Sequence, residues 1–144
     1  MTRLHKSATE QRDYAAALAP GSIGNIGPGL DVLGMAVSGP GDRVVAERLA
    51  IPGVVIADPG HAELPREADR NTAGIAATHV LAREGAQDIG ISLTITKGLP
   101  QFGGQGGSAA SAVAGSVAVK RLIGSPLDEV ALLGCASYAD ITCQ

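Results

Sequence analysis

A glycine-rich loop that leads directly into a helix is the part of this sequence best suited to chemistry. Residues 103–108 read Gly-Gly-Gln-Gly-Gly-Ser, and the small residues after them predict a helix over 109–123. Such a loop presents unpaired backbone N–H groups and the positive end of the helix dipole, and its missing side chains let a phosphate approach closely. The loop therefore predicts a triphosphate cradle, and a flexible turn that merely allows close packing is the alternative.

Two common phosphate motifs can be compared with this loop. The G-x-x-x-x-G-K-[ST] motif fails, because no lysine follows the glycines. The G-x-G-x-x-G/A motif is met by Gly104, Gly106 and Ala109, and Asp128 lies beyond the position expected for a ribose-binding acid. A dinucleotide-binding fold places its loop after the first strand and adds several βα units, whereas only two helices are expected after this loop. The sequence therefore argues against both a Walker loop and a Rossmann fold.

A second glycine-rich segment makes the pattern more specific. Residues 20–34 read PGSIGNIGPGLDVLG, residues 97–100 read KGLP, and residues 104–111 read GQGGSAAS. In this order and spacing they resemble the first and second motifs of the GHMP small-molecule kinases, in particular those of homoserine kinases, over residues 14–140. Two motifs together are much harder to match by chance than either loop alone.

The resemblance implies a role for each matching position. Asn25 and Asp31 fall where the family contacts its amino-acid substrate, and Asn71 falls where an asparagine lies near the adenine. Ser108 and Asp140 are implied as the catalytic, magnesium-binding pair, since hydroxyl and carboxylate oxygens suit that cation. The remaining ATP-binding positions implied by the family are Pro100, Gly103, Gly104, Gln105, Gly106, Gly107 and Ala109, together with Ser108 itself.

Three of these polar residues also have a purely structural interpretation. Asp31 follows a Pro-Gly pair and could cap a turn, and Asn71 could cap the helix that follows it. Asp140 could simply be the polar residue that ends an apolar helix. For each of these residues the sequence is compatible with both interpretations.

The resemblance implies transfer of the γ-phosphoryl group of ATP to the side-chain hydroxyl of L-homoserine, with Mg²⁺, in cytoplasmic threonine biosynthesis. This reaction needs positioning and charge stabilisation rather than a protein nucleophile. Phe102, Gln105 and Gly107 depart from the usual family residues of the loop, which predicts weakened binding of ATP. Two alternatives remain: another GHMP kinase that phosphorylates a different small-molecule alcohol, and a non-catalytic nucleotide-binding fragment or degenerate kinase.

Hydrophobic periodicity predicts an α+β fold around these motifs. Strands are expected at 14–19, 32–37, 43–49, 53–57 and 89–96, and helices at 71–86, 109–123 and 125–140. The resemblance adds an N-terminal GHMP-kinase-like fold, similar to domain 2 of ribosomal protein S5, with a mixed sheet and helices packed on one face.

The connections between these elements follow from turn-forming residues. Residues 21–29 are expected to form a loop, and Gly39-Pro-Gly41 a tight connection between two antiparallel strands. Residues 58–70 are expected to form a surface connection. Ser125 is expected to be the N-cap of the last helix, with Pro126 in its first turn.

The composition indicates a packed globular chain without a nucleic-acid or membrane partner. The sequence is 45% hydrophobic and 17% charged, which argues against disorder. Three aromatic residues and a formal net charge of −3 leave little for nucleic-acid binding. No apolar run approaches the roughly 18 residues of a membrane span, and the apolar stretch near the N-terminus is too short for a signal-peptide core. Cys135 and Cys143 are expected to be reduced thiols.

The chain is expected to hold one domain. Residues 1–13 form an N-terminal tail in this interpretation, and residues 14–144 form the ATP-binding domain. Kinases of the family continue into a C-terminal domain, which is expected to be absent from this chain. An N-terminal half alone exposes apolar surface, which favours a homodimer or association with the missing C-terminal half.

Overall fold

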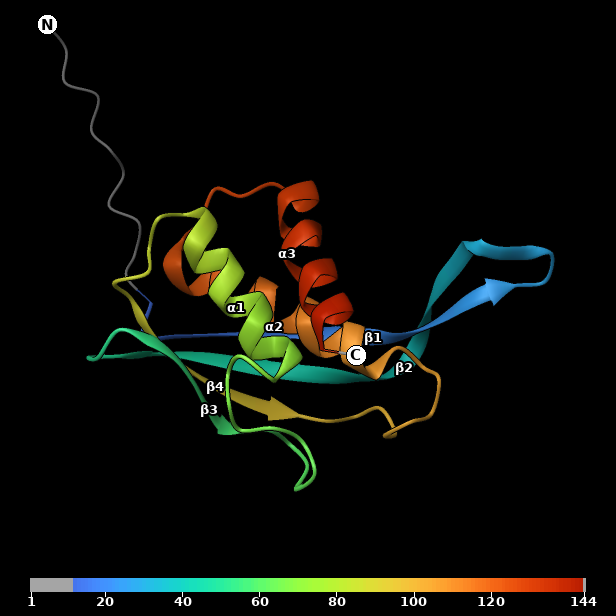
Figure 1. Ribbon diagram of the computed structural model, residues 1–144, viewed down its shortest axis with the longest axis horizontal. Helices are drawn as coiled ribbons and strands as arrows, with labels where there is room; N and C mark the ends of the chain where they lie inside the picture. Colours follow the sequence, from blue (N-terminus) through green and yellow to red (C-terminus); the bar gives the residue numbers. More distant parts are fainter. Residues whose placement is uncertain (1–11, 144) are drawn as a thin grey trace, which may run out of the picture.

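The computed structural model describes residues 12–143. Its strands are β1 (Tyr14–Ile26), β2 (Gly29–Leu49), β3 (Gly53–Asp58) and β4 (Gly90–Thr96), and its helices are α1 (Thr72–Arg83), α2 (Gly107–Ile123) and α3 (Glu129–Thr142) (Figure 1). Three strands come first along the chain, and α1, β4, α2 and α3 follow them. Strands and helices are thus largely segregated in the sequence, as expected for an α+β fold.

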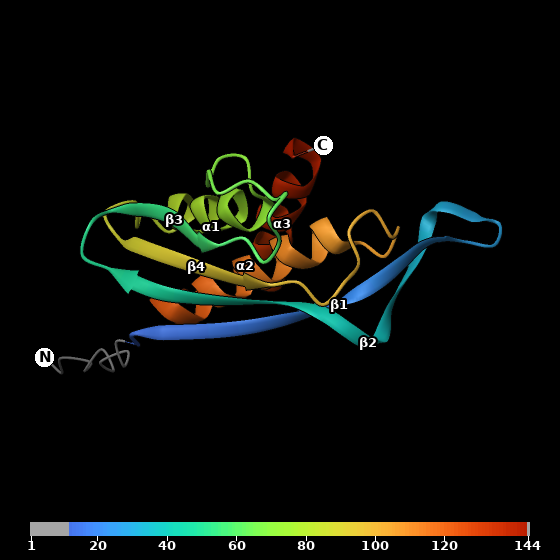
Figure 2. The same cartoon turned by 90° about the horizontal axis from the view of Figure 1, so that it is seen from below.

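The four strands form one mixed sheet in the order β1-β2-β4-β3. β2 pairs antiparallel with both β1 and β4, whereas β3 runs parallel to β4. A parallel pair needs a long crossover, and α1 provides it between β3 and β4. Figure 2 shows α1 and α3 on one side of the sheet. Because the sheet contains both antiparallel and parallel strand pairs, the predicted mixed sheet is confirmed.

The core lies between one face of the sheet and the helices. Alternate residues of β1, β2 and β4 are buried there, as the period of two of a strand requires. Many core residues are small, so the helices can lie close to the sheet. The strand residues of this cluster are Ala15, Ala17, Ala19, Val44, Ala46, Ile56, Ile91, Leu93 and Ile95. Its helical residues include Ala73, Val80, Ala110, Ala114, Val119 and Leu122, which confirms that the helices cover one face.

The first glycine-rich segment is not the predicted loop. Residues 21–26 continue β1, and they pair with the first part of β2 in a ribbon that projects from the body of the molecule (Figure 1). The pairing runs from Ser22↔Ala36 to Ile26↔Gly29. Backbone hydrogen bonds need no side chains, so a glycine-rich segment forms a strand once a partner lies beside it.

The predicted hairpin at Gly39-Pro-Gly41 is also wrong, because β2 passes through these residues as one strand. β1 runs alongside both halves of β2, and the register jumps from Pro20↔Gly41 to Ser22↔Ala36. Residues 37–40 thus form a bulge in β2, with Gly39 at a φ of 139°. The Gly-Pro-Gly sequence accommodates this irregularity instead of reversing the chain.

Most of the predicted helix and strand positions are confirmed, with corrections at the ends. Asn71 is the N-cap of α1, and Gly85, at a φ of 63°, follows the last turn. The last helix begins later than predicted, because its N-cap is Asp128. The Ser125 hydroxyl accepts a hydrogen bond from the Leu127 amide, 3.1 Å away, so it stabilises the connection before α3.

Further sequence predictions concern the termini, the cysteines and membranes. Residues 1–11 and 144 lie outside the described residues, so the division into a tail and a domain stays a prediction. The carbonyl groups of Arg12 and Asp13 accept hydrogen bonds from Arg48. Cys135 and Cys143 are free thiols. No helix within residues 12–143 is long and apolar enough to cross a membrane.

The close crossing of β2 and the segment after β4 gives a test of the fold. A Cβ atom at Gly98 would overlap the carbonyl oxygen of Gly41, which is backbone and cannot swing away. We expect Gly98→Ala to lower the free energy of unfolding by about 2 kcal/mol, measured by urea denaturation. A Cβ atom at Gly24, on the ribbon, meets nothing within 4 Å, so Gly24→Ala is the control. Equal stability of the two variants would contradict this crossing.

Candidate active site

One cavity gathers most of the residues that the sequence singled out. It has a volume of about 470 Å³ and lies where the loop before α2 meets the start of α1 and the end of α3. Residues 100–109 line it continuously, as do Asn71 and Asp140. The predicted ATP-binding and magnesium-binding positions therefore lie around one space.

The N-terminus of α2 forms one wall of this cavity. Gly106 is its N-cap, with a φ of 69°, and no side chain caps the helix. The first turn holds no acidic residue that would oppose an anion. The first N–H groups of a helix lack partners within the helix and carry its positive dipole end. This wall therefore suits a phosphate.

The glycine loop is attached to the base of the ribbon. The amide of Ser22 donates a hydrogen bond to the carbonyl oxygen of Gln105, 3.0 Å away. A Cβ atom at Gly106 would overlap the hydroxyl of Ser22, and one at Gly103 would stand 2.7 Å from the Pro100 ring. Glycine at these positions is thus needed for close approach.

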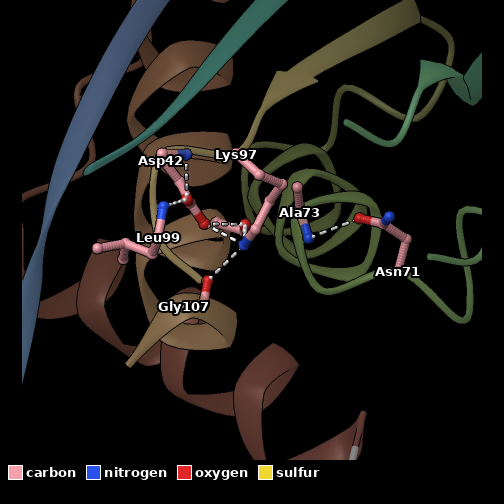
Figure 3. Close-up of polar contacts among 8 residues, drawn as sticks. Asp42, Asn71, Ala73, Lys97, Leu99 and Gly107 are labelled. Atoms are coloured by element: carbon pink, nitrogen blue, oxygen red, sulfur yellow. Dashed lines mark hydrogen bonds and ion pairs between the residues drawn. The ribbon is translucent and has the colours of Figure 1, made fainter. Parts of the chain in front are cut away.

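Asn71 acts as a helix cap. Its side-chain oxygen accepts a hydrogen bond from the amide of Ala73 at 3.1 Å (Figure 3) and another from the amide of Gly74 at 3.4 Å. Its side-chain nitrogen donates to the carbonyl oxygen of Pro65, 3.0 Å away. The structural interpretation is confirmed, and Asn71 also lines the cavity. Its predicted contact with adenine stays a prediction.

Ser108 and Asp140 reach the cavity from different helices. Ser108 lies in the first turn of α2, and Asp140 lies in the last turn of α3. Mg²⁺ is usually held by one or two protein oxygens together with phosphate oxygens and waters, so this pair fits the cation. No group of three or more His, Cys, Asp or Glu side chains that could hold a metal ion occurs within residues 12–143. The role of the pair stays a prediction.

Cys143 also lines the cavity, close to Asp140. Its thiol donates a hydrogen bond to the carbonyl oxygen of Arg70, 3.2 Å away. Burial raises the pKa of this thiol, and the negative charge of Asp140 raises the pKa further. Cys143 is therefore mainly a protonated thiol near neutral pH and a poor nucleophile.

The predicted substrate-binding residues belong to the first two strands. Asn25, at a φ of 58°, is near the end of β1, and Asp31 is near the start of β2. Both positions belong to the ribbon that projects from the body of the molecule (Figure 2), and Asn25 is not among the residues that line the cavity. Their roles stay predictions.

A buried polar network behind the loop was missed at the sequence level. Asp42 is fully buried, and its carboxylate interacts with the ammonium group of Lys97 and the hydroxyl of Ser111 (Figure 3). The available signal was the strand period, which puts Asp42 on the same face of β2 as Val44 and Ala46. An acid on a buried face needs partners.

Phe102 is one of the three departures from the usual family residues of the loop. Its side chain is 96% exposed, so the ring contacts almost nothing. Its φ is 57°, a left-handed conformation that costs energy for any residue with a Cβ atom. The departure at this position therefore strains the backbone rather than filling the site.

Comparison with known proteins places the fold in a family of small-molecule kinases. The family profile described as the N-terminal domain of GHMP kinases matches residues 71–143, half of the chain, and the chain belongs to this family. The homoserine kinase of Methanopyrus kandleri is 44% identical over 122 residues, which cover 85% of this chain and 39% of that protein. The homoserine kinase of Xylella fastidiosa is 44% identical over 115 residues, 78% of this chain and 35% of that protein.

A solved structure agrees with these relatives. The homoserine kinase from Cytophaga hutchinsonii matches with a TM-score of 0.86 and 34% identity, over 92% of this chain and 42% of that one. This agreement confirms the predicted resemblance to homoserine kinases. The chain spans less than half the length of each of these three relatives.

Backbone strain in the loop gives one test of this geometry. We expect Phe102→Gly to raise the free energy of unfolding by about 1 kcal/mol, since glycine adopts a positive φ without steric cost. Gly104 has a φ of 63° and nothing within 4 Å of a Cβ atom, so we expect Gly104→Ala to lower stability by about 1 kcal/mol. Urea denaturation measures both. Lower stability of Phe102→Gly, or unchanged or higher stability of Gly104→Ala, would contradict the loop conformation.

Alkylation of Cys143 gives a second test. In a Cys135→Ala background, we expect iodoacetamide to react with Cys143 more slowly than with an unfolded thiol, because a raised pKa leaves less thiolate at a given pH. Asp140→Asn removes one cause of the raised pKa and is expected to speed the reaction at pH 8. Asp88→Asn, at an exposed position outside the cavity lining, is the control. A rate that Asp140→Asn leaves unchanged would argue against this proximity.

Proposed function

We propose that this chain binds the triphosphate of ATP at the N-terminus of α2 and serves the phosphorylation of L-homoserine on its side-chain hydroxyl. The observation that carries the proposal is the α2 N-terminus without a side-chain cap, facing a cavity that Ser108 and Asp140 also line. The 44% identity to the homoserine kinase of Methanopyrus kandleri supports this acceptor over other alcohols. A role in cytoplasmic threonine biosynthesis is part of the proposal.

The backbone of the loop would do most of the binding. Residues 103–107 offer amide groups without bulky side chains, and the helix dipole favours the negative charge of the β- and γ-phosphates. Ser108 and Asp140 would hold Mg²⁺ with their oxygens, and the bound cation would neutralise charge that develops on the transferred group. Asn71 would lie at the end of the cavity that receives the nucleobase.

The acceptor would be oriented from the ribbon. Asn25 and Asp31 carry an amide and a carboxylate, which suit the hydroxyl and ammonium groups of L-homoserine. Both lie on the projecting part of β1 and β2, and the base of that ribbon is bonded to the glycine loop through Ser22 and Gln105. Acceptor and nucleotide would thus be held by two connected segments.

A second candidate function is binding of nucleotide without transfer. Gly107 supplies a backbone amide but no hydroxyl, so the loop offers one oxygen fewer to phosphate and cation than a serine would provide. In this case Mg-ATP would bind to the loop and raise the melting temperature without turnover.

Turnover measurements separate these functions. We expect release of ADP from Mg-ATP that depends on L-homoserine, and we expect Ser108→Ala to lower kcat by about 100-fold, because charge stabilisation at the transferred group is lost. Ser125→Ala, which removes a hydroxyl from the connection before α3, is the matched control. Binding of Mg-ATP without turnover would support the second candidate, and turnover with mevalonate or galactose alone would reassign the acceptor.

A further inference from the structure

The buried carboxylate of Asp42 has no role in the reaction as proposed above. Its side chain projects from β2 on the core face of the sheet and therefore has no solvent exposure. One carboxylate oxygen accepts hydrogen bonds from the amides of Gly98 and Leu99, at 3.1 and 3.2 Å. The other accepts from the hydroxyl of Ser111, 2.7 Å away, and from the ammonium group of Lys97. This carboxylate is therefore fully satisfied by partners 55 to 69 residues away in the sequence.

The ammonium group of Lys97 also has a hydrogen-bond partner for each of its hydrogens. An ammonium group has three hydrogens to donate. Those of Lys97 are directed to the Asp42 carboxylate, to the Ser111 hydroxyl at 2.9 Å and to the carbonyl oxygen of Gly107 at 3.0 Å (Figure 3). Lys97 could bind a phosphate only by giving up one of these bonds, although it also lines the cavity.

These bonds join three segments at the point where the glycine loop enters α2. Asp42 belongs to β2, Lys97 directly follows β4, and Gly107 is the first residue of α2. The loop itself has few side chains that could fix its own position, because five of the residues 98–107 are glycine. A buried ion pair is costly to desolvate and is weak as a source of stability, whereas it can select one arrangement of the groups around it.

We propose that Asp42, Lys97 and Ser111 are positioning residues that hold the first turn of α2 and the glycine loop in the orientation that receives the phosphates. The proposal rests on the proposed function for the identity of the ligand. The positioning itself is a property of the unliganded chain. Lys97 acts through the Gly107 carbonyl group and does not contact phosphate.

A pair of serines on α2 offers a matched test. Ser111 and Ser116 are both buried on this helix, but the Ser116 hydroxyl has no hydrogen-bond partner within the described residues. Serine-to-alanine substitution thus removes a network hydroxyl at position 111 and an unpartnered hydroxyl at position 116. We expect Ser111→Ala to raise the Kd for Mg-ATP about fivefold by calorimetry, and Ser116→Ala to leave it within twofold.

Amide spectra of the unliganded chain test positioning without any nucleotide. We expect Ser111→Ala to shift or broaden the NMR signals of Gly104, Gly106 and Gly107, while the signals of Ile91 and Leu93 in β4 stay in place. Ser116→Ala should leave the glycine signals unchanged. If both variants leave these signals unchanged, or if both perturb them equally, the positioning role is overturned.

The side-chain nitrogen of Lys97 separates positioning from direct phosphate binding. The sequence has three lysines, Lys6, Lys97 and Lys120, so the ammonium signals can be assigned by substitution. We expect the Lys97 ammonium signal to persist in the unliganded chain, protected by its three hydrogen bonds, and to keep its position when Mg-ATP is added. A large shift on addition of Mg-ATP would overturn the claim that Lys97 does not contact phosphate. If the wild-type chain binds no Mg-ATP, the proposed function fails, while the amide spectra still decide the positioning role.

Discussion

The carboxylate of Asp42 connects the parts of this molecule on which the site depends. It binds two backbone amides after β4, the ammonium group of Lys97 and the hydroxyl of Ser111 on α2. Burying a charge costs much free energy unless such partners surround it. The buried carboxylate therefore requires β2, the loop and α2 to be in these relative positions at the same time. The glycine contact between residues 41 and 98 lies beside this network and has the same effect, because any side chain at position 98 would push the two segments apart.

The glycine loop needs this support from neighbouring segments because its site consists mainly of backbone groups. The glycine loop offers amide groups to an anion because it lacks side chains, and for the same reason it has little with which to fix its own conformation. Support comes from outside the loop, through the Gly107 carbonyl group on one side and the Ser22 amide on the other. The small residues of the core serve the same end, since they let α2 lie close enough to β1 and β2 for these bonds to form.

Much of the local structure could be predicted, and the failures share one cause. The alternation of Ile91, Leu93 and Ile95 correctly predicted β4, and Asn71 correctly predicted the start of α1. Both predictions succeeded because each pattern depends only on residues close together in the sequence. The glycine-rich segment 21–29 and the Gly-Pro-Gly at 39–41 were misassigned, because β1 pairs with β2 on both sides of the bulge. A neighbouring strand satisfies backbone groups that local turn preferences would have left to solvent.

The sequence by itself determined the family and the glycine loop that opens α2, because glycine spacing and hydrophobic period are local properties of the chain. Only the tertiary structure decided that Ser108 and Asp140 share one cavity, that Asn25 and Asp31 lie on a projecting ribbon, and that Asp42 is the partner of Lys97. The physical reason is separation along the chain. Contacts between residues 42, 97 and 111 arise from how strands pair and helices pack, and no window of a few residues contains them.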